Sequence, residues 1–229
     1  MSSIRVLALA VSLVIGLASA SSAAPITLPT GLTAGEQYRL AFVTSSARDA
    51  LSGDIADYNA FVTSVANAIP ELASLGTTWT AIGSTLLVDA RDNTSTNPTV
   101  ESGYAIYLLN DTKLVDDYAD LWDGSIDVPL DIDETGAAET FPSNQVWTGT
   151  ATDGTAGGSG LPLGGIDVTW GNSAFAFGIW IDDGSTTSPN FNRQLYAVSG
   201  VLTAVPEPGT ALLLALGLAI LGGRRRRLI

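Results

Sequence analysis

The sequence predicts an α+β protein: a single loop-rich domain with one main helix near its N-terminal side and antiparallel strands, placed between an N-terminal signal helix and a short C-terminal transmembrane helix. Three observations predict this class. Only one long stretch has the apolar spacing of an amphipathic helix, short runs of aromatic and β-branched residues follow it, and long polar stretches separate those runs. A β-sandwich would show strands at a closer and more regular spacing.

The first 23 residues have the pattern of a secretory signal peptide. Arg5 is followed by an apolar run over residues 6–18 and then by small residues, which is the order of the charged, apolar and cleavage regions. Signal peptidase is expected to cut after Ala20 or Ala23. An uncleaved anchor fits less well, because the apolar run is short and ends in small residues. Residues 24–204 are therefore assigned to the exported domain.

The first strand of that domain is expected over residues 38–44, and the main helix over residues 54–69. Ser52 or Asp54 can cap the start of this helix, and Pro70 marks its end. A second, short helical turn is expected over residues 71–75. The helix is predicted by five apolar positions at spacings of three, four, three and four residues, which form one stripe: Ile55, Tyr58, Val62, Val65 and Ile69.

The remainder of the domain is predicted as short strands joined by polar loops. Aromatic and β-branched residues predict strands over residues 78–84, 104–109, 145–150, 166–170, 174–181 and 194–204. Polar, Gly-rich or Asp-rich composition predicts loops over residues 89–102, 111–140 and 153–160.

Composition restricts the chemistry of the exported domain. It contains five basic and 22 acidic residues, a net charge of −17, against −13 for the whole chain. Such a charge opposes binding to nucleic acid or anionic lipid and favours cations as partners. The chain has no His and no Cys, which rules out Ser-His-Asp and Cys-His catalytic centres, His-bearing zinc sites and disulfides. Hydrolysis by paired carboxylates stays open.

The C-terminal segment, residues 205–229, has three parts in a fixed order. Residues 206–208 read Pro-Glu-Pro, residues 211–223 are almost wholly apolar, and an arginine cluster follows. The 13 apolar residues would make a helix of about 20 Å, short of the ~30 Å hydrocarbon core, a deficit that bilayer thinning and snorkelling can cover. The positive-inside rule keeps the arginines in the cytoplasm and places the preceding domain across the membrane.

This three-part tail resembles the PEP-CTERM sorting signal of Gram-negative bacteria. The resemblance implies recognition by an exosortase, a membrane transpeptidase-like protease, and processing near Pro206, Glu207 and Pro208. It also implies export across the inner membrane, anchoring in the envelope until processing, and then release to the cell surface or extracellular matrix. A tail anchor that is never cut is the alternative. The basic tail consists of Arg224, Arg225, Arg226 and Arg227.

Two further motifs suggest the family of the domain itself. Residues 121–124 read Leu-Trp-Asp-Gly, and residues 146–150 read Val-Trp-Thr-Gly-Thr. Together with Phe-Val-Thr at residues 42–44 they resemble a bacterial surface-domain family of undefined function with a C-type-lectin-like fold. The resemblance covers residues 38–180 and implies a C-type-lectin-like ectodomain. The chain departs from this family by lacking all cysteines.

Acidic residues concentrate in the second predicted loop. Asp131, Asp133 and Glu134 form its sharpest piece and are the candidate ligands of a Ca²⁺ ion, which takes six to eight oxygens in flexible geometry. The pattern is not an EF-hand loop, and solvated acidic loops are the simpler interpretation. Catalytic pairs are a third: Asp131 with Glu134, or Asp120 with Asp123. The full set is Asp116, Asp117, Asp120, Asp123, Asp127, Asp131, Asp133 and Glu134.

The sequence therefore leaves two classes of function. The first is a non-enzymatic, exported cell-surface or extracellular-matrix protein, with calcium or glycan as candidate ligand and extracellular polysaccharide as candidate partner. The second is a secreted carbohydrate-active hydrolase that uses paired carboxylates. The tryptophans are expected to lie in the core, with Trp122 and Trp170 as the exceptions, because turn residues follow both.

Overall fold

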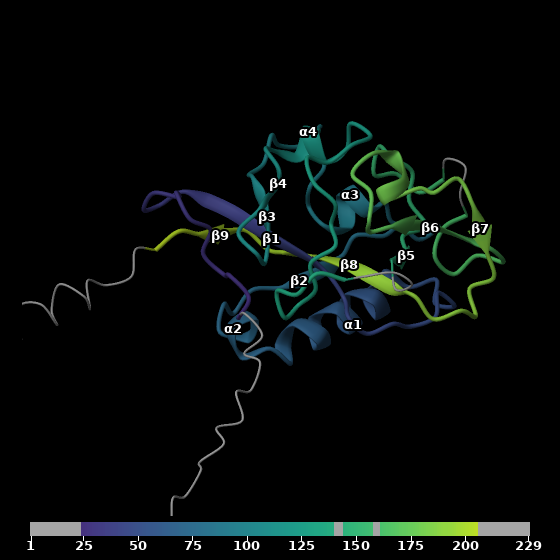
Figure 1. Ribbon diagram of the computed structural model, residues 1–229. Helices are drawn as coiled ribbons and strands as arrows, with labels where there is room; N and C mark the ends of the chain where they lie inside the picture. Colours follow the sequence, from purple (N-terminus) through teal and green to yellow (C-terminus); the bar gives the residue numbers. More distant parts are fainter. Residues whose placement is uncertain (1–23, 140–143, 158–160, 206–229) are drawn as a thin grey trace, which may run out of the picture.

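The computed structural model describes residues 24–139, 144–157 and 161–205 (Figure 1). The predicted signal peptide at residues 1–23 lies outside the described residues. So do the Pro-Glu-Pro motif, the apolar segment 211–223 and the basic tail 224–227. Within the described ranges, no helix has the length and apolar character needed to cross a membrane.

A mixed sheet forms the centre of the described chain. Its strand order is β4–β3–β1–β8–β5–β6–β7, with β2 paired to β8 and β9 paired to β1. The strands are β1 (Gln37–Val43), β2 (Trp79–Ala81), β3 (Ile106–Leu108), β4 (Lys113–Val115), β5 (Gln145–Trp147), β6 (Val168–Asn172), β7 (Thr186–Thr187), β8 (Gln194–Ser199) and β9 (Leu202–Thr203). Figure 1 shows β1 and β8 running through the middle of the molecule, with β6 and β7 at the end opposite β9.

The predicted antiparallel arrangement is wrong for two strand pairs. β1 pairs with β3 in parallel, and β5 pairs with β8 in parallel. A parallel pair needs a long crossover connection. More than sixty residues join β1 to β3, including the main helix and β2, and β6 and β7 lie between β5 and β8. The α+β class is confirmed, and the C-type-lectin-like fold stays a prediction.

The main helix forms as predicted. α1 (Ile55–Asn67) starts after Asp54, whose side chain accepts a hydrogen bond from the Ala56 N–H at 3.0 Å. The predicted stripe faces the core, with Tyr58 and Val62 fully buried. α2 (Pro70–Ala73) begins at Pro70, where the sequence places the end of the main helix. In Figure 1, α1 and α2 lie below β2 and β8, and α3 (Ala90–Asn93) and α4 (Tyr118–Leu121) lie higher in the view. Asn59 of α1 and Asn93 of α3 bond to each other at 2.8 Å and to the backbone of β2 at Ala81.

Two predicted strands differ from the structure. Residues 174–181 form a turn of 3-10 helix, η1 (Gly178–Trp180), because Trp180 folds back with its N–H bonded to the Phe177 carbonyl and its ring fully buried. Residues 194–204 divide at Gly200 into β8 and β9. The predicted loops over 89–102 and 111–140 contain short elements that the sequence analysis did not predict: α3, β4 and α4.

Four of the five tryptophans belong to the core. Trp79, Trp147 and Trp180 are fully buried, as expected. The prediction for Trp122 is wrong: its ring is buried, and its indole N–H donates to the Thr96 hydroxyl at 2.9 Å. Trp170 is half-buried. Tryptophan stacking on a ligand therefore has little accessible surface in this domain.

Candidate functional site

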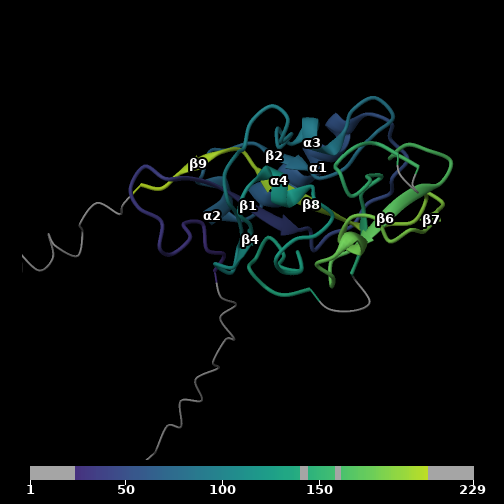
Figure 2. The same cartoon turned by 90° about the horizontal axis from the view of Figure 1, so that it is seen from above.

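The junction between the folded domain and its C-terminal tail lies at the edge of β1. β9 pairs with the start of β1. β9 lies at this end of the molecule both in Figure 1 and in the view from above (Figure 2). Ala204 follows β9 and is 4% exposed; its N–H donates to the Glu36 carbonyl at 2.8 Å, and its own carbonyl accepts from the Gly35 N–H at 2.9 Å. Val205 is 68% exposed. The ordered backbone pairing of the domain thus ends two residues before Pro206.

The predicted calcium ligands lie on a hairpin over residues 131–139. Ile132 pairs with Ala138 across this hairpin. The Asp133 carboxylate points back into the turn, where it accepts from the Thr135 N–H at 2.8 Å, the Thr135 hydroxyl at 2.7 Å and the Ala137 N–H at 3.0 Å. Asp133 therefore closes the turn, as Asp side chains do in Asx-turns.

Glu134 attaches the hairpin to the end of β1. Its carboxylate accepts from the Ser45 N–H at 2.8 Å and also from the Ser45 hydroxyl. Asp133 bridges to Val43 alongside. Both acidic side chains are more than nine-tenths buried, and both have hydrogen-bond donors of the protein itself.

The structure does not bring Asp131, Asp133 and Glu134 together as one set of metal ligands. Across residues 24–139, 144–157 and 161–205, no group of three or more acidic residues is placed to hold a metal ion. Calcium binding stays a prediction.

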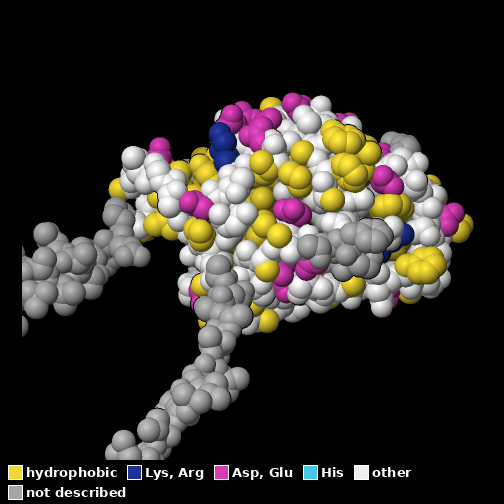
Figure 3. All heavy atoms as spheres, in the orientation of Figure 1, with side chains coloured by type: hydrophobic (Ala, Val, Ile, Leu, Met, Phe, Trp, Pro, Cys, Tyr) yellow, Lys and Arg dark blue, Asp and Glu magenta, His cyan; other side chains and the backbone are white. Residues whose placement is uncertain are grey.

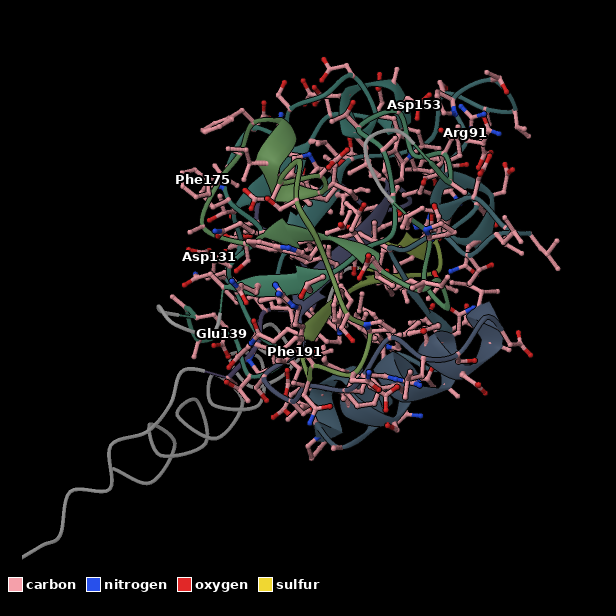
Figure 4. The ribbon with its side chains drawn as sticks, turned by 90° about the vertical axis from the view of Figure 1, so that its right-hand side faces the viewer. Arg91, Asp131, Glu139, Asp153, Phe175 and Phe191 are labelled. Atoms are coloured by element: carbon pink, nitrogen blue, oxygen red, sulfur yellow. The ribbon has the colours of Figure 1, made fainter. Side chains whose placement is uncertain are left out.

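Asp131 lies opposite Glu139 rather than beside Glu134. The Glu139 N–H donates to the Asp131 carbonyl at 2.7 Å, next to the Ile132 pair, so both side chains project from the same face of the hairpin. Figure 4 shows the two residues on the same side of the molecule. Burial raises the pKa of Asp131. Burial also raises the pKa of Glu139, against a smaller lowering by the Gln194 side chain. Glu139 is not among the site residues predicted from the sequence, although Asp131 and Glu139 stand at equal distances from Thr135 in the turn, a spacing that indicates such a pair.

The other predicted carboxylate pair serves local turns. Asp120 accepts from the Asp116 N–H at 2.7 Å, and Asp123 accepts from the Ser125 N–H at 3.0 Å. Asp117 caps α4 by accepting from two backbone N–H groups. These hydrogen bonds are those of capped turns and a capped helix, and they account for much of the acidic cluster.

An arginine is held between two aromatic rings near β5 and β6. The Arg193 guanidinium lies 4.7 Å from the centroid of Trp147 and 4.4 Å from that of Trp170. Burial lowers the pKa of Arg193 to about 10, against a smaller opposite effect of Asp183. The arginine covers both indole rings, which explains why Trp170 is only half-exposed.

Exposed phenylalanines lie in the loops that flank β6 and β7, as one pair and one separate residue. Phe175 and Phe177 form an edge-to-face pair with centroids 5.2 Å apart, and Phe177 and Phe191 are each more than half exposed. Figure 4 shows Phe175 and Phe191 on the face that carries Asp131 and Glu139. Aromatic rings at a surface give an apolar platform with polar neighbours. In Figure 3, acidic side chains are spread over the visible face and basic ones are few.

Two pockets share Ser95 and Glu101 in their lining. One, of about 190 Å³, is lined by Arg91, Asn97 and Glu101; the other, of about 260 Å³, is lined by Arg39, Thr80 and Glu101. A third pocket, of about 400 Å³, is apolar and lined by Leu86, Leu87 and Leu161 with their neighbours. None of these three contains a residue of the predicted calcium site.

Comparison with known proteins identifies the tail. A family model described as the PEP-CTERM protein-sorting motif matches residues 204–227. This match confirms the predicted sorting signal and sets its start at Ala204, the last buried residue of the domain. The motif implies an exosortase as processing partner, export, anchoring in the envelope and sorting to the cell surface. Comparison with curated proteins gives no match for the chain.

Proposed function

We propose that this chain is a non-enzymatic surface or matrix protein of a Gram-negative envelope, delivered by an exosortase that cuts its tail near Pro206, Glu207 and Pro208. The observation that carries the proposal is the sorting motif at residues 204–227, which begins where the pairing of β9 with β1 ends. In this view the apolar segment and the arginines hold the exported domain at the inner membrane until cleavage. The domain is then released toward the cell surface or the extracellular matrix.

Two features support a binding role for the domain over a catalytic one. The acidic side chains of the predicted cluster accept hydrogen bonds within their own turns, which leaves them poorly placed to activate water. The exposed phenylalanines around β6 and β7 offer apolar surface at the end of the domain farthest from the tail (Figure 1). Extracellular polysaccharide is the partner that this surface and the export route favour.

A carbohydrate-active hydrolase is the second candidate, favoured by the Asp131 and Glu139 carboxyls on one face of the hairpin. If the domain is such a hydrolase, the purified domain should release reducing ends from a polysaccharide. Asp131→Asn and Glu139→Gln should each abolish that release. Binding without release supports the matrix protein instead.

The sorting proposal is tested by mass spectrometry of the protein from its native envelope. We expect a mature N-terminus after Ala20 or Ala23 and a C-terminus near Pro208, without the arginine cluster. Glu207→Ala should retain the full tail, whereas Glu71→Ala, an exposed acidic residue on α2, should be processed normally. A mature pool that still ends in the arginines would overturn the proposal.

A further inference from the structure

The sorting tail leaves the folded domain with almost no spacer. Ala204 is bonded through its N–H and its carbonyl to the segment just before β1, and Val205 is the single exposed residue between it and Pro206. The Pro-Glu-Pro motif therefore starts within two residues, at most about 7 Å of chain, from the last buried position.

The membrane is close as well. Six residues separate Ala204 from Ala211, where the apolar segment starts. An extended chain covers at most about 3.6 Å per residue, so the Cα atoms of these two residues lie within about 25 Å of each other. The headgroup layer takes up roughly 6 Å of that reach. The β9 end of the domain, from which the tail leaves, therefore stays within about 20 Å of the membrane surface.

A peptide is commonly recognised as an extended strand whose backbone groups bond to the binding protein. For a cut near Pro206, the upstream part of such a segment is residues 202–205. In the folded domain the backbone groups of Leu202 and Ala204 are already used, because Leu202 pairs with Tyr38 on β1 and Ala204 bonds to Glu36 and Gly35 just before β1. The same N–H and carbonyl groups cannot bond to β1 and to a protease at once.

We propose that residues 202–205 form the upstream part of the exosortase recognition segment and that β9 must detach from β1 before the tail is cut. This rests on the proposed function above. Cleavage breaks one peptide bond: the amine leaves with the released tail, and the carbonyl carbon passes to the protease and then to water or an amine acceptor. The rate of tail loss is then limited by the fraction of molecules in which β9 is open.

The local structure suits such an opening. β9 has only two residue pairs with β1. The Gly200 N–H donates to the Thr78 carbonyl at 2.8 Å, which holds the end of β8 independently of β9. Detachment exposes only the small Ala204 side chain, at the margin of the core, and the already half-exposed Leu202. Short edge segments with few buried contacts are those that open locally at low cost.

A disulfide between β1 and β9 tests the proposal. Gln37 and Thr203 are exposed, and the Ala204 hydrogen bond to Glu36 makes them a non-hydrogen-bonded pair. Such pairs have Cα atoms about 4.5 Å apart, within disulfide range. The chain has no other cysteine, so Gln37→Cys with Thr203→Cys can form a single bridge after export.

Tail loss is followed by pulse–chase in cells that contain the exosortase. We expect the oxidised double variant to lose its tail at least tenfold more slowly than the wild type, and reductant to restore the rate. Gln37→Cys alone, the matched control, should be processed at the wild-type rate. Processing of the oxidised double variant at the wild-type rate would overturn the proposal.

A second variant checks that access is the cause. Four Gly/Ser residues and a second copy of residues 202–205 are inserted before Pro206 in the double variant, which frees one copy of the segment while β9 stays bonded. Restored processing under oxidising conditions supports the proposal, and continued blockage contradicts it. A wild-type chain that keeps its tail would instead contradict the sorting function itself, so the two failures are distinguishable.

Discussion

At the scale of single residues, Arg39 stands out because its charged guanidinium is buried in the core. It is 3% exposed, and within the described residues it forms no ion pair with a carboxylate. Its guanidinium donates to the Ser199 carbonyl at 2.6 Å, to the Thr94 carbonyl at 2.8 Å and, at longer distance, to the Tyr118 hydroxyl. It thus joins β1, β8 and the segment after α3, and burial lowers its pKa.

Replacing this arginine should be costly. Arg39→Met removes the donors and leaves the Ser199 and Thr94 carbonyls buried without partners, so we expect a loss of about 3 kcal/mol in the free energy of unfolding. Arg91→Met is the matched control, because Arg91 is half-exposed and lies 3.9 Å from Asp89; its cost should stay below about 1 kcal/mol. Urea denaturation of the purified domain measures both. Equal losses would show that the carbonyl bonds of Arg39 contribute little.

Residue roles could be predicted only where the partner is near in the sequence. The turn closed by Asp133 involves Thr135 and Ala137, two and four residues away, a spacing that local rules cover. Glu134 bonds to Ser45, which is 89 positions away, and no local pattern indicates that contact. The many acidic residues of this loop therefore suggested a cation site. In the folded chain, several of these carboxylates accept hydrogen bonds from the protein itself.

At the scale of elements, the contact of β6 with η1 fixes one position tightly. Gly171 lies on β6, opposite Val146, and a Cβ added there would be 2.1 Å from the Trp180 carbonyl oxygen. This approach allows the Trp180 ring to enter the core beside Tyr196, to whose hydroxyl the same carbonyl is bonded.

Gly171→Ala should therefore destabilise the domain strongly. Backbone must move to accept the methyl group, and we expect a loss of about 3 kcal/mol. Gly53→Ala is the control, since nothing lies within 4 Å of its added Cβ; the change there should stay within about 0.5 kcal/mol. Thermal unfolding followed by tryptophan fluorescence reports both. A small effect at Gly171 would mean that η1 is loosely packed.

Elements with strong internal periodicity were predictable and short ones were not. α1 was correct because its stripe, cap and following Pro70 all agree. Residues 174–177 alternate Ala and Phe like a strand, but both rings face solvent and the chain turns at Gly178. β4 and α4 have three and four residues. Such elements are stabilised by their neighbours in the fold rather than by their own sequence.

At the scale of the whole molecule, the main electrostatic property is the large negative net charge of the exported domain. With 22 acidic and five basic residues, the folded state carries a large self-repulsion. Salt screens such repulsion over a Debye length of about 10 Å at 0.1 M. Screening of this kind stabilises the folded domain with any cation, whether or not a dedicated site exists.

The salt dependence of the melting temperature distinguishes general screening from a calcium site. We expect the melting temperature to rise by a few degrees between about 0.02 and 0.3 M NaCl, and CaCl₂ and MgCl₂ at matched ionic strength to give equal shifts. Differential scanning fluorimetry of the domain is sufficient. A larger shift with Ca²⁺, lost in Asp131→Asn, would establish the calcium site that the sequence suggests.

The position of β8 determines when the chain can fold during its passage across the membrane. β8 lies in the middle of the sheet and pairs with β1, β2 and β5, yet it comes near the end of the domain. A chain threaded from its N-terminus must hold the edges of those three strands open until residue 199 emerges. The central strand of the sheet is therefore among the last parts of the domain to become available, so the sheet can close only after nearly the whole domain has been exported.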